Sequence, residues 1–242
     1  MFASLVALFA LALPAAAQQP APVCQLTSLG QLAATPPPAV FVLGERRGTS
    51  PDQARAYKLA KKLAKAGPVT LALQAVHTEQ QGVLDGWAQG QVPDEQLGAQ
   101  LQVFDRWGTA PDRYAKLVRG HSVGLQVVAA GVDPTHPPDG VIAPQPPGYV
   151  HLLSGTMGDS PVPVELEGRF ASMVAYTDHR VAARAVEAWD GKGYLVILAD
   201  RLHVEGGKGI GWQAGLLTPA PVKTVLMTRS DSPCYDADLY LR

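Results

Sequence analysis

A strand, a helix and a second strand follow one another near the start of the chain, and this order constrains the fold most strongly. Residues 39–44 are apolar up to a closing glycine, as in a strand buried on both faces. Ser50 and Pro51 predict a helix start, and an apolar stripe continues to about residue 66. A second apolar run follows at 69–73. Because a β-α-β unit joins parallel strands, the sequence predicts an α/β fold.

The same alternation continues along the rest of the chain. Further strands are predicted at residues 123–130, 194–199 and 222–227, and helices at 79–87, 93–104, 111–119 and 169–189. The proline-rich residues 132–149 are predicted to form a surface loop. We therefore expect one α/β domain over residues 39–242, with a mostly parallel sheet and helices on both faces.

The first 17 residues have the pattern of a secretory signal peptide. An apolar run at 5–13 is too short to span a bilayer, and small residues up to Ala17 suit a signal peptidase. No Lys or Arg precedes this run, which departs from the usual pattern. We expect cleavage after Ala17, a proline-rich leader at 18–38, no transmembrane span, and a periplasmic or secreted protein.

The two cysteines, Cys24 and Cys234, lie near opposite ends of the mature chain. In an exported protein such a pair most simply forms a disulfide. Closing a loop of about 210 residues would restrict the unfolded chain by about 4 to 5 kcal/mol on the chain-entropy model. The alternative is an envelope lipoprotein acylated at Cys24, although residues 21–23 match a lipidation signal poorly.

Charge and motifs argue against several function classes. The net charge is −1 and the basic residues form no long tract, which disfavours nucleic acid as a partner. The chain has no His-x-x-x-His and no Walker spacing around its Gly-Gly-Lys-Gly run. Its Gly-x-Ser-x-Gly run, at residues 120–124, leads into the predicted strand at 123–130, whereas a nucleophile elbow follows a strand and begins a helix. An α/β-hydrolase and a phosphate-loop enzyme are therefore not expected.

Polar residues follow three predicted strands, and in a parallel sheet ligands gather beyond the carboxyl ends of the strands. The candidates are Glu45, Arg46, Arg47, Gln74, His77, His203 and, on the long helix, Asp178. Each also has a structural interpretation. Glu45 could pair with a neighbouring arginine, Gln74 could satisfy backbone groups, and His203 could be a packing histidine. Asp178 could be a buried acid held by a helix N-terminus or a guanidinium.

Five segments in order resemble the ChaN family of haem-binding uptake proteins, in the group that includes Tiki-type proteases and erythromycin esterases. They are the strand and Gly-Glu turn at 40–45, residues 79–81, Trp107-Gly108 with Tyr114, residues 176–182, and the His-Val to Gly-Ile segment at 203–210. The resemblance implies a ChaN-like fold over residues 40 to about 216, with haem as the ligand.

The resemblance also implies roles for individual residues. Family members bind haem through a tyrosinate, and Tyr114 is the matching tyrosine. The competing interpretation is that Tyr114 packs against Trp107. His203 is a second candidate for the haem site, and Arg46 or Arg47 could bind the haem propionates through paired hydrogen bonds.

Two departures from the family pattern weaken a metal site. Arg47 stands where the family has His, and Gln74 stands where it usually has Glu. Both changes remove a metal ligand. Glu45 and His203 remain as metal candidates, but a divalent metal is not expected. The Arg47 guanidinium could instead pair with Glu45 and Asp178.

We therefore predict a non-enzymatic protein that binds haem or a related iron or anionic ligand during uptake. An envelope transport partner and a homodimer are compatible with this role. The alternative is a metal-dependent hydrolase with Glu45 as general base and His203 as ligand or acid, Asp178 being the third catalytic candidate. A degenerate interaction module is the third possibility, because Arg47 and Gln74 replace family residues.

Overall fold

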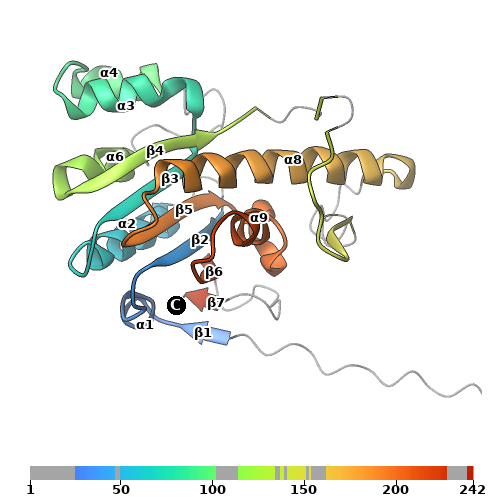
Figure 1. Cartoon of the computed structure of the whole chain (residues 1–242). Helices are drawn as coiled ribbons and strands as arrows, with labels where there is room; N and C mark the ends of the chain where they lie inside the picture. The colour runs from blue at the N-terminus through green and yellow to red at the C-terminus, as the bar shows by residue number, and fades with distance from the viewer. Residues whose placement is uncertain are drawn as a thin grey trace, which may run out of the picture.

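The computed structural model describes residues 25–46, 50–101, 114–133, 137–138, 141–150, 153, 162–227 and 239–241 (Figure 1). They form an α/β fold around a seven-stranded sheet of order β1-β7-β6-β2-β5-β3-β4. All neighbouring strands are parallel, as predicted. The strands are β1 (Gln25–Thr27), β2 (Ala39–Glu45), β3 (Val69–His77), β4 (Leu125–Gly131), β5 (Tyr194–Asp200), β6 (Val222–Met227) and β7 (Leu239–Leu241).

Helices cover both faces of the sheet. One face packs against α1 (Leu29–Ala33), α2 (Ser50–Leu63), α3 (Gln81–Ala88), α4 (Asp94–Gln100) and α6 (Ala115–Val118), and the other against α8 (Val164–Ala188) and α9 (Ile210–Leu217). The described residues also form the 3-10 turns η1 (Thr78–Gln80), η3 (Arg119–Val123), η4 (Arg201–His203) and η5 (Glu205–Gly207). None of the described helices combines the length and the apolar character needed to cross a membrane.

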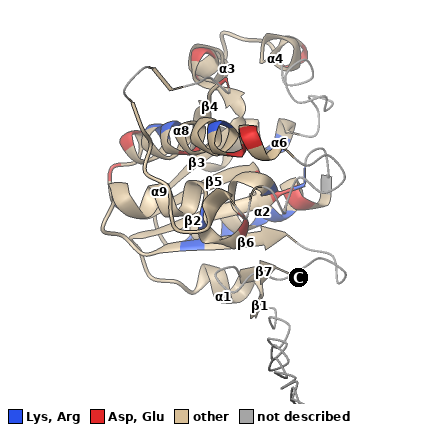
Figure 2. Cartoon of the chain, turned by 90° about the vertical axis from the view of Figure 1, so that its right-hand side faces the viewer, with Lys and Arg blue, Asp and Glu red and all other residues tan. Residues whose placement is uncertain are grey.

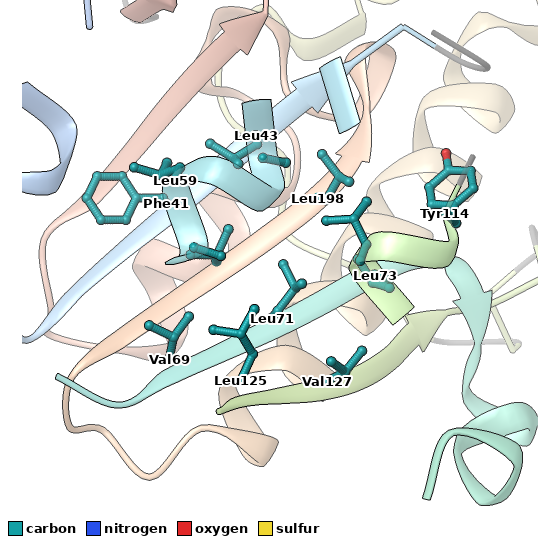
Figure 3. Close-up of a cluster of buried hydrophobic side chains, with 14 of the residues drawn as sticks. Phe41, Leu43, Leu59, Val69, Leu71, Leu73, Tyr114, Leu125, Val127 and Leu198 are labelled. Atoms are coloured by element: carbon teal, nitrogen blue, oxygen red, sulfur yellow. The ribbon is translucent and has the colours of Figure 1, made fainter. Parts of the chain in front are cut away.

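Side-chain alternation along each strand explains the two layers of core. In β2, Phe41 and Leu43 belong to the cluster under α2, while Val40 and Val42 belong to the cluster under α8. The whole strand is buried, which explains its nearly continuous apolar sequence. Figure 3 shows the α2-side cluster, with Tyr114 at its edge.

The predicted leader contributes to the fold from residue 25 onward. β1 pairs in parallel with β7, Gln25 lying opposite Leu239. Ser28 caps α1 through a reciprocal pair of hydrogen bonds with Gln31. Part of the predicted leader is therefore a strand and a helix of the fold. A three-residue strand is too short to show a hydrophobic period.

The long helix α8 begins five residues earlier than predicted, at Val164 in place of residue 169. Figure 1 shows that its first half extends past the sheet. There it buries Ala171, Val174 and Ala175 in a third cluster with residues of the proline-rich loop, including Tyr149. The loop predicted at 132–149 is thus packed against α8 at its end.

Several predicted features lie outside the described residues. These are the signal peptide, Arg47, Trp107, and the cysteines Cys24 and Cys234. The proposed disulfide and the Arg47 ion pairs therefore stay predictions.

Candidate functional site

Three central strands end together at one edge of the sheet. β2 and β5 run in register, so that Glu45 lies opposite Asp200. On the next strand, the Gln74 side chain accepts a hydrogen bond from the Asp200 backbone N–H at 2.9 Å. This contact agrees with the interpretation that Gln74 satisfies backbone groups at a strand end.

Glu45 points from this edge into the face covered by α2 and α6. Its side chain is completely buried, and the Tyr114 hydroxyl donates a hydrogen bond to its Oε1. No described residue donates a hydrogen bond to Oε2. We call Glu45 and Tyr114 the Glu45 cluster.

Burial dominates the electrostatics of the Glu45 cluster. It raises the pKa of Glu45 to about 8, although the hydrogen bond from Tyr114 acts in the opposite direction. Burial, together with the neighbouring Glu45 charge, raises the pKa of Tyr114 far above its ordinary value. Tyr114 is therefore held as a neutral phenol that donates to a carboxyl group.

Arg46 lies at the rim of this cluster, bound to Asp52. Its backbone N–H and its Nε donate to Asp52 Oδ2 at 3.1 and 3.3 Å. Asp52 is completely buried at the start of α2, and Arg55 donates to its other oxygen at 3.4 Å. The sequence suggested Glu45 as partner of a neighbouring arginine, whereas the structure shows Arg46 on Asp52.

A second group of polar residues lies on the opposite face of the sheet. Asp178 of α8 is completely buried and accepts two hydrogen bonds, one on each oxygen. His203 Nδ1 lies 2.6 Å from Oδ1, and the Tyr149 hydroxyl lies 2.6 Å from Oδ2. We call Asp178, His203 and Tyr149 the His203 cluster. Asp178 is thus a buried acid, but a phenol and an imidazole hold it in place of the predicted helix N-terminus or guanidinium.

The protons of the His203 cluster follow from these contacts. Burial and the Asp178 charge raise the pKa of Tyr149, so Tyr149 stays a neutral phenol and donates a hydrogen bond to Asp178. The short contact at Nδ1 assigns the imidazole N–H to that nitrogen, facing the carboxylate. A metal ion would therefore bind His203 at Nε2, and a proton would be transferred at the same atom. The His203 side chain is 16% exposed, whereas Asp178 is 0% exposed.

The segment after His203 closes tightly around the cluster. A Cβ on Gly209 would lie 2.1 Å from the His203 carbonyl oxygen and 3.0 Å from Asp178 Oδ2, so only glycine fits. The Lys208 side chain lies beside Gly148, the residue directly before Tyr149: its Nζ is 2.9 Å from the position that a Cβ on Gly148 would occupy. A positive charge therefore lies beside the cluster.

The predicted site residues divide between the two faces. Glu45 follows Phe41 and Leu43, which face α2, while Asp178 and His203 lie next to Val181 and Val204 of the α8-side core. Glu45 therefore contacts Tyr114 on the α2 side of the sheet, whereas Asp178 contacts Tyr149 and His203 on the α8 side. Side-chain alternation in β2 explains the separation.

Sequence reasoning did not connect Tyr149 or Lys208 with Asp178 and His203. Tyr149 ends a proline-rich loop whose composition predicts only a surface connection. The segment at 203–210 was chosen only by its resemblance. Among the residues that the structure describes, no group of three or more His, Cys, Asp and Glu side chains is placed to hold a metal ion.

Comparisons with known proteins confirm the resemblance. Residues 32–139 match the family model for haem-binding uptake proteins of the Tiki superfamily, ChaN. A search of curated protein sequences finds no match. Among solved structures, ChaN of Campylobacter jejuni, described as binding haem cofacially, superposes with a TM-score of 0.62 at 16% identity, over 87% of this chain and 88% of that chain.

A second solved structure is the C-terminal region of Pasteurella multocida toxin, described as having a thiol-protease-like catalytic triad. It gives a TM-score of 0.50 at 13% identity, over 83% of this chain and 25% of that chain. Because both sequence identities are below 25%, the two structures show similarity of fold alone.

Proposed function

We propose that this chain, which has a ChaN-like fold and matches the ChaN haem-binding uptake model over residues 32–139, binds haem through the His203 cluster. The match to a haem-binding family supports the ligand class. The geometry around His203 supports the site. The role that follows is haem or iron uptake.

The Asp178–His203 contact is the observation that carries this proposal. Histidines that ligate metals generally donate their other ring N–H to a carboxylate or carbonyl, which fixes the ring and raises its basicity. Asp178 provides such a carboxylate at 2.6 Å from Nδ1, and Tyr149 fixes Asp178 in turn. Haem iron would be ligated by Nε2, in the manner of a proximal histidine.

Tyr114 fits the axial ligand role less well than His203. A tyrosinate ligand must lose its proton, and burial beside Glu45 raises the pKa of Tyr114. Its hydroxyl is also held by Glu45. We therefore place the ligand at His203, although the family resemblance alone favoured the tyrosine.

Cations for the haem propionates come from two places. Arg46 is already bound to the buried Asp52, so a propionate would have to share it. Lys208 lies beside the Tyr149 loop and needs no such exchange with Asp52. We propose Lys208 as the propionate partner, with Arg46 and Arg47 as the alternatives from the sequence.

Export and a disulfide belong to the same proposal. Cys24 directly precedes β1, and Cys234 lies five residues before β7, the strand that pairs with β1. The pairing of Gln25 with Leu239, described residues close in sequence to the two cysteines, supports a Cys24–Cys234 bond. Mass spectrometry of the unreduced protein from the periplasm would find the cross-linked peptides and an N-terminus at residue 18. Two free thiols would overturn it.

A haem titration followed by Soret absorbance tests the binding site. We expect saturable binding, weakened at least about ten-fold by His203→Ala and unchanged by Tyr114→Phe. His179→Ala is the matched control, because this neighbouring histidine bonds Gln213 instead of Asp178. Binding that depends on Tyr114 and ignores His203 would contradict the proposal.

A hydrolase is the second candidate, because the same Asp178–His203 pair could orient a general base. The Glu45 pKa of about 8 would also suit acid-base chemistry, but Glu45 faces the other side of the sheet. Turnover of peptides or esters that is lost in His203→Ala would favour this function. A protein with neither haem binding nor turnover would fit the degenerate interaction module.

A further inference from the structure

The lysines of the chain are concentrated on one side of the molecule. Five of the eight lysines in the sequence lie on α2, directly after it, or on α6. They are Lys58, Lys61, Lys62, Lys65 and Lys116, and all five are exposed. Figure 2 shows basic residues on α2. Since the net charge of the chain is −1, this concentration is local.

Three of these lysines line a groove between the two helices. The groove has a volume of about 360 Å³ and is lined by Ala54, Tyr57, Lys58, Lys61 and Lys116. Lys58 and Lys61 are one helical turn apart and so lie side by side. Lys61 Nζ lies 5.4 Å from the centre of the Tyr57 ring. The groove thus combines an aromatic wall with ammonium groups from both helices.

The helices that form the groove provide no acid to balance these charges. Asp52 is the only acidic residue on α2, and α6 and the neighbouring α1 contain none. Asp52 is buried and bound by Arg46 and Arg55. Among the described residues of these helices no exposed acid faces the lysines, so their positive charges repel one another and favour an anionic ligand.

We propose that this groove binds the phosphate group of a ligand whose apolar part covers Tyr57. A phosphate monoester carries a charge of about −1.5 to −2 at neutral pH, more than a single carboxylate, and so matches several converging ammonium groups. Lysine binds phosphate as a mobile point charge, which suits side chains from two helices. The ligand is either a free phosphorylated molecule or the headgroup of an anionic lipid.

This site is separate from the proposed haem site. α2 and α6 cover one face of the sheet, and the His203 cluster lies on the face covered by α8. The two proposals can therefore fail independently. His203→Ala should leave phosphate binding unchanged.

Two probes distinguish the sources of phosphate. Inorganic pyrophosphate, followed by isothermal titration calorimetry, represents the free molecule. Cosedimentation with vesicles of phosphatidylglycerol and phosphatidylcholine, compared with phosphatidylcholine alone, represents the lipid. Each is measured on the full mature chain and on Lys58→Gln/Lys61→Gln. The matched control is Lys62→Gln/Lys65→Gln, which removes the same charge from residues that do not line the groove.

We expect at least one probe to bind saturably, with a loss of about ten-fold or more in the groove pair and less than about two-fold in the control pair. Circular dichroism should show equal folding of both variants, because all four lysines are exposed. Equal losses in the two pairs would indicate diffuse charge attraction and overturn the proposal. Failure of both probes to bind would overturn it as well.

Discussion

The Glu45 cluster and the His203 cluster use the same pairing of a tyrosine with a buried carboxyl group, yet they differ in what else that group meets. Asp178 is satisfied on both oxygens, by Tyr149 and by His203. Glu45 receives Tyr114 on one oxygen and no described donor on the other. The first carboxylate directs an imidazole toward the surface, while the second is enclosed with a raised pKa.

Only one of the two clusters therefore presents a side chain that a ligand can contact. The Gly-Glu turn keeps its glutamate, but β2 directs that side chain under α2. The His-Val to Gly-Ile segment keeps a histidine that a buried acid orients and that remains partly exposed. We therefore regard the Glu45 cluster as a structural element and the His203 cluster as the binding element.

Removing Asp178 should have the largest effect. Asp178→Ala leaves the Tyr149 hydroxyl and the His203 imidazole without their shared acceptor, which should cost about 3 to 5 kcal/mol of unfolding free energy. Urea unfolding measures it. Glu187→Ala, on the exposed side of the same helix, should change stability by less than about 0.5 kcal/mol. A similar small loss for Asp178→Ala would contradict the central role of this acid.

Glu45 should make the free energy of unfolding depend on pH. Because the folded pKa of Glu45 is raised to about 8, the folded state binds more protons than the unfolded state between pH of about 5 and 8. Wild-type stability should therefore fall as pH rises through this window, by about 3 kcal/mol in all relative to Glu45→Gln. Unfolding curves at several pH values test this. Parallel pH profiles for the two proteins would show that Glu45 ionises normally.

Gly209 tests the tight closure of the His203 cluster. Gly209→Ala places a methyl group against the His203 carbonyl and Asp178, so we expect a loss of about 2 kcal/mol and weaker haem binding. Gly215→Ala in α9 is the control, since nothing lies within 4 Å of its new Cβ and alanine favours a helix. Should both substitutions prove neutral, the closure around His203 is looser than described.

Substituting the two tyrosines should have the smallest effects on stability, but should affect haem binding differently. Tyr114→Phe and Tyr149→Phe each remove one hydrogen bond to a buried carboxyl group, costing about 1 to 2 kcal/mol. Only Tyr149→Phe should weaken haem binding, because it loosens Asp178 and hence His203. Paired unfolding and haem titrations measure both effects. Haem binding weakened only by Tyr114→Phe would reverse our assignment of the two clusters.

The sequence predicts the fold well where strands are long and fully buried. The strands at 39–44, 69–73 and 194–199 were recognisable because burial on both faces makes them continuously apolar. The short strands β1 and β7 escaped prediction, since three residues show no period. Their pairing depends on contacts between the two ends of the chain.

The sequence indicates three candidate site residues but not the contacts that they make. Glu45, Asp178 and His203 were all chosen, from strand ends and from family resemblance. Their separation depends on the face to which Glu45 points, and the partner Tyr149 comes from a loop without a readable pattern. Such contacts arise from tertiary packing between distant segments, which no local spacing encodes.

We propose His203, held by Asp178, as the iron ligand. Resonance Raman spectroscopy of the haem complex tests it directly, because iron–imidazole and iron–phenolate bonds give different vibrations. We predict an iron–imidazole vibration in the ferrous complex that is absent in His203→Ala and shifted in Asp178→Asn, where the Nδ1 hydrogen bond is weaker. Phenolate vibrations in the ferric complex that disappear in Tyr114→Phe would contradict it.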